Sequence, residues 1–265
     1  MTFQKTDGSA KSADGTTIGF QKLGTGPSLV VVHGSLSTGD EWLPFATALA
    51  DQYTCYLMAR RGRARSADAM DYSLVKECED IKAVLDAAGP SASLVGHSYG
   101  AICALEAASR FRVPKLVLYE PPLPVNEAVV GPAFDDFRAA VERSEFDEAL
   151  TIGLKGLIKM ADKEVAALRS SPLWAHMAAL TPTWVRECEE IKQLEFGVAR
   201  FSAMASPTLL LVGSVTAAHH IVASQALQRT LPDVRLHEFE GQSHQAHLTA
   251  TADFAAATAD FLLGR

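Results

Sequence analysis

The feature that most constrains this chain is a glycine-flanked serine between a short apolar run and a helix-like segment. Leu94-Val95 reads as the end of a strand, Gly96-His97-Ser98-Tyr99-Gly100 follows, and small apolar residues continue through residues 101–105. Gly-x-Ser-x-Gly in a strand–turn–helix context is typical of a nucleophile elbow, a sharp turn that holds the serine hydroxyl clear of the backbone. The alternative is a glycine-rich turn with an unreactive serine. The motif alone does not distinguish the two interpretations, so the residues elsewhere in the chain are needed.

Apolar runs and helical patterns alternate along most of the chain. Residues 1–28 carry turn signals and an alternating run, which predict strands joined by turns. Continuous apolar runs predict buried strands, and apolar residues at about every 3.6 positions predict helices. The expected later strands cover 29–32, 53–58, 94–95, 116–119, 208–213 and 234–239, and the expected helices 40–50, 74–88, 101–109, 220–230 and 252–263. This alternation predicts an α/β fold with a mostly parallel sheet and helices on both faces.

Residues 123–204 break this alternation. The segment has no strand-like run, but it contains several helix-like stretches rich in large apolar residues, including Trp174 and Trp184. We therefore expect a helical cap inserted over the C-terminal edge of the sheet. The two flanking segments, 1–122 and 205–265, would form one α/β core, for which 265 residues are sufficient.

Polar residues follow the predicted strands at the ends where such sheets bind ligands. His33-Gly34, Ser98, Glu120, Gly213-Ser214 and His244 each come just after a predicted strand. Ligands of open parallel sheets bind outside the carboxyl ends of the strands. The convergence of these residues at one edge favours Ser98 as a nucleophile over an unreactive serine.

On these motifs the chain resembles the α/β-hydrolase family, in its small capped esterase-like branch. The resemblance rests on the order and spacing of His33-Gly34, Gly96-His97-Ser98-Tyr99-Gly100 and Gly241-x-x-His244, and it spans nearly the whole length. It implies an eight-stranded, mostly parallel sheet with a helical cap inserted after the sixth strand.

The resemblance also implies roles for individual residues. Ser98 would be the nucleophile, and His244 the general base that takes its proton and returns it to the leaving group. The backbone N–H groups of Tyr99 and Ser35 would form the oxyanion hole, with Leu36 as the alternative to Ser35. A serine nucleophile, in place of an aspartate, argues against the dehalogenase and epoxide-hydrolase chemistries of this fold.

The acid of a catalytic triad is where the sequence departs from the family pattern. The acid usually follows strand seven, but residues 213–218 contain no carboxylate and Val215 stands where an aspartate is expected. A catalytic histidine needs an acceptor on its second ring nitrogen, and losing it can cost about 10⁴ in rate. Some family members, including certain macrocyclic-lactone hydrolases, carry the acid after strand six, the position of Glu120. We therefore assign Glu120 as the triad acid.

Alternatives to this assignment stay open. Glu120 could instead be a residue packed at the entrance of the cap. The site could be a Ser–His dyad supported by Ser214 or Thr216, or catalysis could have been lost. Weaker candidates for the acid lie on a turn or on the final strand: Asp233, Glu238 and Glu240.

Four residues are expected to contact the substrate: Leu36, Trp174, Trp184 and His220. Leu36 follows the oxyanion loop, the tryptophans belong to the cap, and His220 opens a helix near the site. Other histidines are expected to be structural, with His237 inside a strand and His247 packed one helical turn beyond His244. In this family His33 usually braces the oxyanion loop. We expect no metal and no cofactor.

The charge and the apolar pattern limit the partners. The net charge is −7 with both signs mixed, and no basic stripe is present, so a nucleic-acid partner is not expected. The one basic cluster, residues 60–65, is expected to be a solvated or salt-bridged turn. No apolar run approaches the length of a membrane span. We expect a small-molecule substrate as the partner and no membrane, and the sequence is compatible with a homodimer.

The cysteines and the N-terminus indicate the compartment. The first ten residues are polar and lack the apolar region of a signal peptide. The cysteines are widely spaced, match neither a metal motif nor a disulfide framework, and are expected to be buried in a reducing compartment: Cys55, Cys78, Cys103 and Cys188. The sequence therefore predicts a cytoplasmic protein.

These observations predict a serine hydrolase that cleaves a carboxylic ester or lactone through an acyl-Ser98 intermediate. The apolar cap favours a neutral, moderately hydrophobic substrate. The same triad also supports carbon–carbon bond hydrolysis and cofactor-free perhydrolysis, and no sequence feature excludes either. A non-catalytic ligand-binding homologue is the rival from another class, because the strand-seven acid is missing.

Overall fold

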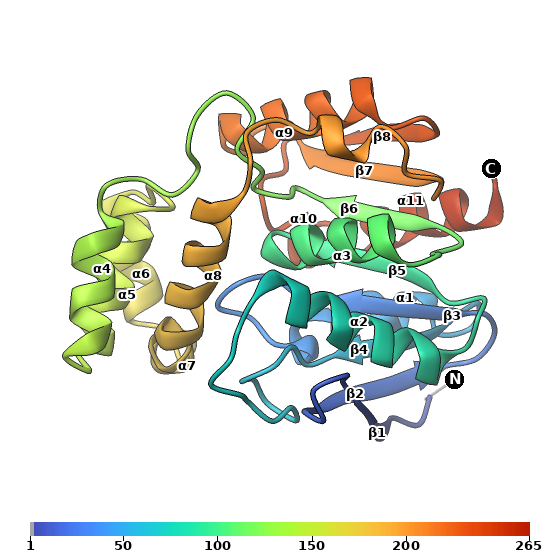
Figure 1. Cartoon of the computed structure of the whole chain (residues 1–265), viewed down its shortest axis with the longest axis horizontal. Coiled ribbons are helices and arrows are strands. Elements are labelled where there is room, and N and C mark those ends of the chain that lie inside the picture. Colours follow the sequence, from blue (N-terminus) through green and yellow to red (C-terminus); the bar gives the residue numbers. More distant parts are fainter. Residues whose placement is uncertain (1–2) are drawn as a thin grey trace.

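A single eight-stranded sheet organises the protein (Figure 1). The computed structural model describes residues 3–265, so Met1 and Thr2, the first positions of the expected core segment, lie outside the described residues. The strands are β1 (Thr6–Lys11), β2 (Thr17–Gly24), β3 (Ser28–Val32), β4 (Thr54–Met58), β5 (Ser93–His97), β6 (Leu116–Tyr119), β7 (Thr208–Gly213) and β8 (Val234–Phe239).

The strand order is β1-β2-β4-β3-β5-β6-β7-β8. The first three strands in this order pair antiparallel, and every later pair is parallel. The predicted mostly parallel α/β sheet is therefore confirmed. The chain crosses from β4 over β3 to reach β5, so the strand order reverses between β3 and β5. A crevice at the carboxyl ends of strands forms at such a reversal, and ligands bind there in open α/β sheets.

Strand side chains alternate between two apolar layers. Val30 and Val32 pack on one face of the sheet, and Leu29 and Val31 on the other. The first layer also contains side chains of α2 (Leu74–Ala88), α3 (Tyr99–Arg110) and α9 (Ala218–Thr230), and the second those of α1 (Leu43–Leu49) and α11 (Thr251–Leu263). Because both faces are covered, the central strands read in the sequence as continuous apolar runs. Two short 3₁₀ helices and one short α-helix complete the core: η1 (Gly39–Trp42), η2 (Ala199–Phe201) and α10 (Ala246–Thr249).

Five helices between β6 and β7 form a separate helical lobe at one end of the sheet (Figure 1). They lie in the segment where we expected a helical insertion, and they have an apolar cluster of their own. The helices are α4 (Phe134–Glu142), α5 (Phe146–Gly156), α6 (Asp162–Arg169), α7 (Leu173–Ala179) and α8 (Thr181–Gln193). In Figure 1, α8 lies between the other helices of the lobe and the core.

Buried ion pairs join α8 to the core. Arg60 and Arg63, from the loop after β4, are at most 1% exposed, and the Nη2 atoms of both contact Glu187 Oε1 of α8, at 2.7 and 2.5 Å. The Arg60 guanidinium also contacts Glu77 of α2 at 2.6 Å, and that of Arg61 contacts Asp80 at 2.6 Å. The turn is salt-bridged as expected, and three of its four arginines are not solvated, because carboxylates from two helices enclose them. The side chain of the fourth, Arg65, is 34% exposed and pairs with Asp7 and Asp40.

Two further expectations concern cysteines and membrane spans. All four cysteines are buried and unpaired. Within residues 3–265, no helix combines the length and the apolar character that crossing a bilayer requires.

Candidate active site

Ser98 occupies a strained turn between β5 and α3. Its backbone angles are φ 54° and ψ −125°, in a region that non-glycine residues rarely adopt and that is common at functional sites. The flanking glycines are required by close packing. A Cβ at Gly96 would lie 2.6 Å from the Gly100 carbonyl oxygen, and a Cβ at Gly100 would lie 2.3 Å from that of His33. The Gly-x-Ser-x-Gly motif therefore forms the strand–turn–helix that its sequence predicted.

The loop after β3 passes directly beside Ser98. A Cβ at Gly34 would lie only 2.9 Å from the Ser98 Cβ. Ser35 follows in this loop, and Tyr99 is the first residue of α3, where backbone N–H groups have no partner within the helix. The two expected oxyanion donors thus belong to segments that flank the serine.

The His33 side chain holds the loop after β3 by hydrogen bonds at both ring nitrogens. Its Nε2 accepts the Arg60 backbone N–H at 3.2 Å, so Nδ1 carries the proton and donates to the Gly34 carbonyl at 2.9 Å. Complete burial lowers the pKa of His33 well below its ordinary value, which keeps the ring neutral for this role. Leu36, with φ 53°, places its side chain in the apolar cluster of the helical lobe.

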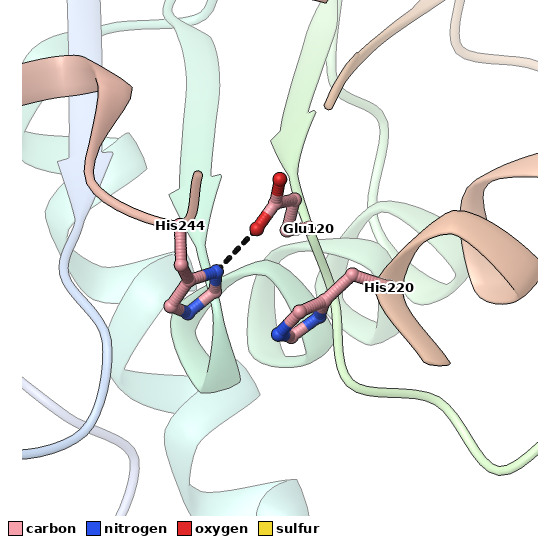
Figure 2. A group of neighbouring side chains, drawn as sticks. All are labelled: Glu120, His220 and His244. Atoms are coloured by element: carbon pink, nitrogen blue, oxygen red, sulfur yellow. Dashed lines mark hydrogen bonds and ion pairs between the residues drawn. The ribbon is translucent and has the colours of Figure 1, made fainter. Parts of the chain in front are cut away.

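His244 and Glu120 form a close pair (Figure 2). His244 Nδ1 lies 2.5 Å from Glu120 Oε2. Glu120 is completely buried, immediately after β6, with φ 50°. Its carboxylate also accepts the Gly213 backbone N–H and the Thr216 hydroxyl, both at 2.8 Å.

The loop after β7 supports this carboxylate and contributes no acid of its own. Val215, where the family's acid was expected, is 64% exposed. The last residue of β7, Gly213, and Thr216 in the loop after it instead donate hydrogen bonds to Glu120. Hydrogen bonds of this kind stabilise the ionised form of a buried carboxylate. Thr216, considered above as a supporter of a Ser–His dyad, contacts Glu120.

Two residues that the sequence analysis did not single out hold the backbone of the His244 loop. The Tyr119 hydroxyl donates to the Ser243 carbonyl and accepts the Ala246 N–H at 2.9 Å. His97 Nε2 donates to the His244 carbonyl at 3.0 Å. A buried tyrosine hydroxyl at a strand end requires a partner, which was the available signal for Tyr119. The position of the partner, more than 120 residues later, was not readable.

His244 belongs to a continuous series of neighbouring aromatic rings. The centroid distances between neighbours are 4.3 Å for Trp42–His247, 4.6 Å for His247–His97, 4.6 Å for His97–His244 and 4.3 Å for His244–His220. Burial is the main cause that lowers the pKa of His97, His220 and His247, and for His247 the value falls to about 3. These three rings are therefore neutral near pH 7. His247 packs in the core, as expected.

Glu120, His220 and His244 also meet the minimum requirement for a metal site, because their ligand atoms lie within 4.8 Å of one another. The ring geometry does not fit one. The His220 and His244 rings are stacked and nearly parallel, with an angle of 11° between their planes. The nitrogen lone pairs lie in the planes of the two rings, so they do not converge on one metal ion. His244 Nδ1 is moreover engaged by Glu120. The group fits an acid–base pair better than a metal centre.

Of the four residues expected to contact the substrate, two lie near the candidate catalytic residues and two lie inside the helical lobe. His220 lies against His244, and Leu36 lies between the oxyanion loop and the lobe. Trp184 packs against Phe137 at 4.8 Å, and the Trp174 indole N–H donates to Asp147 at 2.6 Å. Both indoles thus make contacts within the lobe's own core, and the substrate contacts expected for them stay a prediction.

Two cavities lie away from Ser98, Glu120 and His244. The larger, of about 610 Å³, runs along β8 and α11. The smaller, of about 130 Å³, is lined by Pro124, Ile191 and Phe196, among others, beside α8. None of the three candidate catalytic side chains lines either cavity.

Comparison with known proteins identifies the family. A profile described as "Alpha/beta hydrolase family" matches residues 29–257. The chain belongs to the α/β-hydrolase family. The resemblance to this family that the three motifs indicated is thereby confirmed.

Solved structures of other α/β hydrolases superpose over nearly the whole chain. One, an alpha/beta hydrolase from Sphaerobacter thermophilus DSM 20745, is 30% identical, with a TM-score of 0.83 over 93% of this chain and 99% of that one. The esterase RhEst1 from Rhodococcus sp. ECU1013 is 21% identical, with a TM-score of 0.75 over 98% of each chain. The second similarity shows the fold alone.

A curated relative matches over a shorter stretch. It is named "Putative carbamate hydrolase RutD", from Escherichia coli O9:H4 (strain HS), and is 30% identical over 95 residues. The match covers 35% of this chain and 36% of the relative, so the chain spans about a third of the length of the relative that it matches.

Proposed function

We propose that this α/β hydrolase cleaves a carboxylic ester or lactone by way of an acyl-Ser98 intermediate. The observation that carries the proposal is the 2.5 Å contact between His244 Nδ1 and the buried Glu120 carboxylate, in a protein whose Ser98 occupies a strained elbow. A carboxylate on Nδ1 fixes the imidazole tautomer that leaves Nε2 free to accept a proton. Glu120 would be the triad acid, supplied by strand six.

The proposed reaction has two halves. His244 Nε2 takes the Ser98 proton as Oγ attacks the carbonyl carbon, and returns that proton to the departing alcohol oxygen. A water molecule then enters, gives its proton to His244, and attacks the acyl carbon to release the acid and restore Ser98. Glu120 stabilises the imidazolium that forms in each half without itself taking the proton.

The negative oxygen of each tetrahedral intermediate would be held by the backbone N–H groups of Ser35 and Tyr99. Both lie beside Ser98, and the start of α3 adds the partial positive charge of a helix N-terminus. Such donors typically contribute on the order of 10²–10³ each in rate.

A neutral, moderately hydrophobic small molecule is the proposed substrate. We propose that the helical lobe acts as a cap, since its apolar cluster reaches the oxyanion loop at Leu36. Esterases are among the solved structures with this fold, and one of the sequence relatives is named "Putative carbamate hydrolase RutD". Ester and carbamate hydrolysis share the acyl-transfer chemistry proposed for Ser98.

The first experiment tests the nucleophile. Wild-type protein is expected to hydrolyse p-nitrophenyl butyrate and to be labelled by a fluorophosphonate probe at Ser98, and Ser98→Ala should lose both. Lactones, aryl carbamates and a carbon–carbon bond substrate tested alongside, with product analysis, would separate the reaction classes. Absence of labelling in the folded wild type would reject the hydrolase proposal and favour a ligand-binding homologue.

The second experiment tests the acid. Glu120→Gln should lower kcat by about 10⁴, because the imidazolium loses its counter-charge and the tautomer is no longer enforced. The matched control is Glu238→Gln on β8, an exposed carboxylate that should leave kcat unchanged. Full activity of Glu120→Gln would show that the acid on strand six is not used.

A further inference from the structure

His220 stacks on the proposed catalytic histidine from the first turn of α9. Its ring lies 4.3 Å from that of His244, centroid to centroid, and the two planes differ by 11° (Figure 2). His220 is only 6% exposed. The loop that leads into α9 carries no acid, and the first turn of α9 places the His220 ring beside His244.

The His244 ring is not fully held by its other contacts. Its loop backbone is anchored by Tyr119 and His97, and its Nδ1 by Glu120. One hydrogen bond at Nδ1 leaves the ring free to pivot about that contact, which would change the direction in which Nε2 points. The His244 side chain is also 29% exposed, so the surrounding protein does not enclose it on every side.

Flat contacts on the ring itself restrict that pivot. His97 meets the ring from β5, at 4.6 Å and a tilt of 42°, and His220 meets it from α9 in the nearly parallel arrangement. A parallel ring in van der Waals contact opposes rotation out of the plane, whereas a tilted ring touches only part of the surface. His220 therefore covers more of the His244 ring face than His97 does.

The hydrogen bonds of the His220 ring do not involve His244, since a ring N–H donates to the backbone carbonyl of Glu120. The Nδ1 of His220 is buried and has no hydrogen-bond partner. Burial, together with the neighbouring His244 and His219, lowers the pKa of His220 well below its ordinary value, so the ring is uncharged near neutral pH. Because stacked rings do not point their nitrogens at one another, His220 cannot pass a proton to His244 along a hydrogen bond. Toward His244 the ring therefore presents a planar, neutral surface.

We propose that His220 is a positioning residue, which holds the His244 ring in the plane that directs Nε2 at Ser98. The inference rests on the proposed serine-hydrolase function. The sequence predicted that His220 contacts the substrate, whereas the proposed role is a contact with the proposed catalytic base, His244.

Two variants separate a planar contact from a merely buried one. His220→Leu keeps an apolar side chain but removes the flat ring, and should lower kcat for p-nitrophenyl butyrate about 10-fold with KM within about twofold, because small misplacements of a catalytic group cost rate. His220→Phe restores a flat ring and should keep kcat within about threefold of wild type. Titration with the fluorophosphonate probe counts competent sites, so misfolded protein does not affect the comparison.

The controls distinguish the possible failures. His237→Leu makes the same change at an exposed histidine of β8 and should leave kcat unchanged. An inactive, unlabelled wild type would overturn the proposed function itself. With an active wild type, the positioning role is overturned by an unchanged kcat in His220→Leu, by equal losses in the Leu and Phe variants, or by a loss that appears only as a raised KM.

Discussion

At the scale of single residues, the site depends on histidines that stay neutral. His247 illustrates the physical cause: its ring stacks flat on Trp42, at 4.3 Å and 10°, is 1% exposed, and has no hydrogen-bond partner at either nitrogen. A proton on such a ring would be a buried, uncompensated charge, so burial lowers its pKa to about 3. The neutral ring packs well among its aromatic neighbours near neutral pH, and its contribution to the free energy of unfolding is lost in acid.

The sign of the pH effect follows from linkage. Between about pH 3 and 6.5 the unfolded chain binds a proton at His247 that the folded chain does not, so the free energy of unfolding falls as the pH falls through this window. For one group the slope approaches about 1.4 kcal/mol per pH unit. His247→Phe keeps the stacking and removes the titration. Between pH 7 and pH 5 its unfolding free energy should fall by about 2 kcal/mol less than that of wild type.

Urea unfolding at both pH values measures the difference. His237→Phe makes the same substitution at an exposed histidine and should follow the wild-type pH dependence. Parallel pH dependences of His247→Phe and wild type would show that His247 takes up its proton without cost in the folded protein.

At the scale of elements, the end of β6 organises the His244 loop. Tyr119 and Glu120 are consecutive, and they reach the same loop at different points: Tyr119 holds the backbone at Ser243 and Ala246, and Glu120 holds the ring of His244. Because Tyr119 and Glu120 both belong to the end of β6, one strand holds both the backbone of the loop and the His244 ring. A shift of β6 relative to β8 would disturb both contacts together.

Tyr119→Phe tests the backbone half of this arrangement. The variant keeps the ring but leaves the Ser243 carbonyl and the Ala246 N–H without the hydroxyl, which should lower the unfolding free energy by about 1–3 kcal/mol. Because the loop carries His244, kcat should also fall, by about 10-fold. Thermal unfolding and p-nitrophenyl butyrate turnover measure the two effects. Tyr56→Phe on β4 is the matched control. Equal effects in the two variants would show that the Tyr119 hydroxyl does not hold the His244 loop.

The sequence predicts those parts of the site that depend on local patterns. The strands, the elbow at Ser98 and the carboxylate after β6 could be identified because apolar periodicity, flanking glycines and position after a strand are all local. The structure refines some limits: α3 begins at Tyr99, two residues before the expected start. What could not be predicted depends on distant partners. Nothing near Arg60 indicates that Glu187, 127 residues later, buries it, and the same holds for Tyr119 and its loop.

At the scale of the whole molecule, one charged face of α8 attaches the helical lobe to the core. Arg186 contacts Asp68 at 2.8 Å, and the Glu190 carboxylate accepts the backbone N–H of Leu74 at the start of α2, at 2.7 Å. Between them, Glu187 lies buried against Arg60 and Arg63. Burial alone would raise the pKa of Glu187, but the two guanidinium charges outweigh it and lower the pKa below its ordinary value. Glu187 is therefore ionised near neutral pH, at the centre of this interface.

The same network reaches the oxyanion loop, which links lobe attachment to catalysis. Arg60 donates from Nη1 to the Gly34 carbonyl at 3.4 Å, and its guanidinium lies 4.7 Å from the centroid of the Tyr99 ring. Glu187→Gln would leave Arg60 and Arg63 short of a counter-charge inside the protein. Removing one partner of a buried ion pair typically destabilises a protein by about 3–5 kcal/mol, and we expect a loss of unfolding free energy in this range.

We further expect the p-nitrophenyl butyrate kcat of the folded variant to fall, because Arg60 contacts the segments on both sides of the proposed oxyanion hole. Urea unfolding and turnover per fluorophosphonate-titrated site measure stability and rate separately. Glu142→Gln, at an exposed ion pair with Arg138 on α4, is the matched control and should change neither, since exposed pairs contribute little. A Glu187→Gln protein with wild-type stability would show that α8 does not depend on this charge for its attachment. One that is destabilised but turns over at the wild-type rate per site would separate lobe attachment from the oxyanion hole.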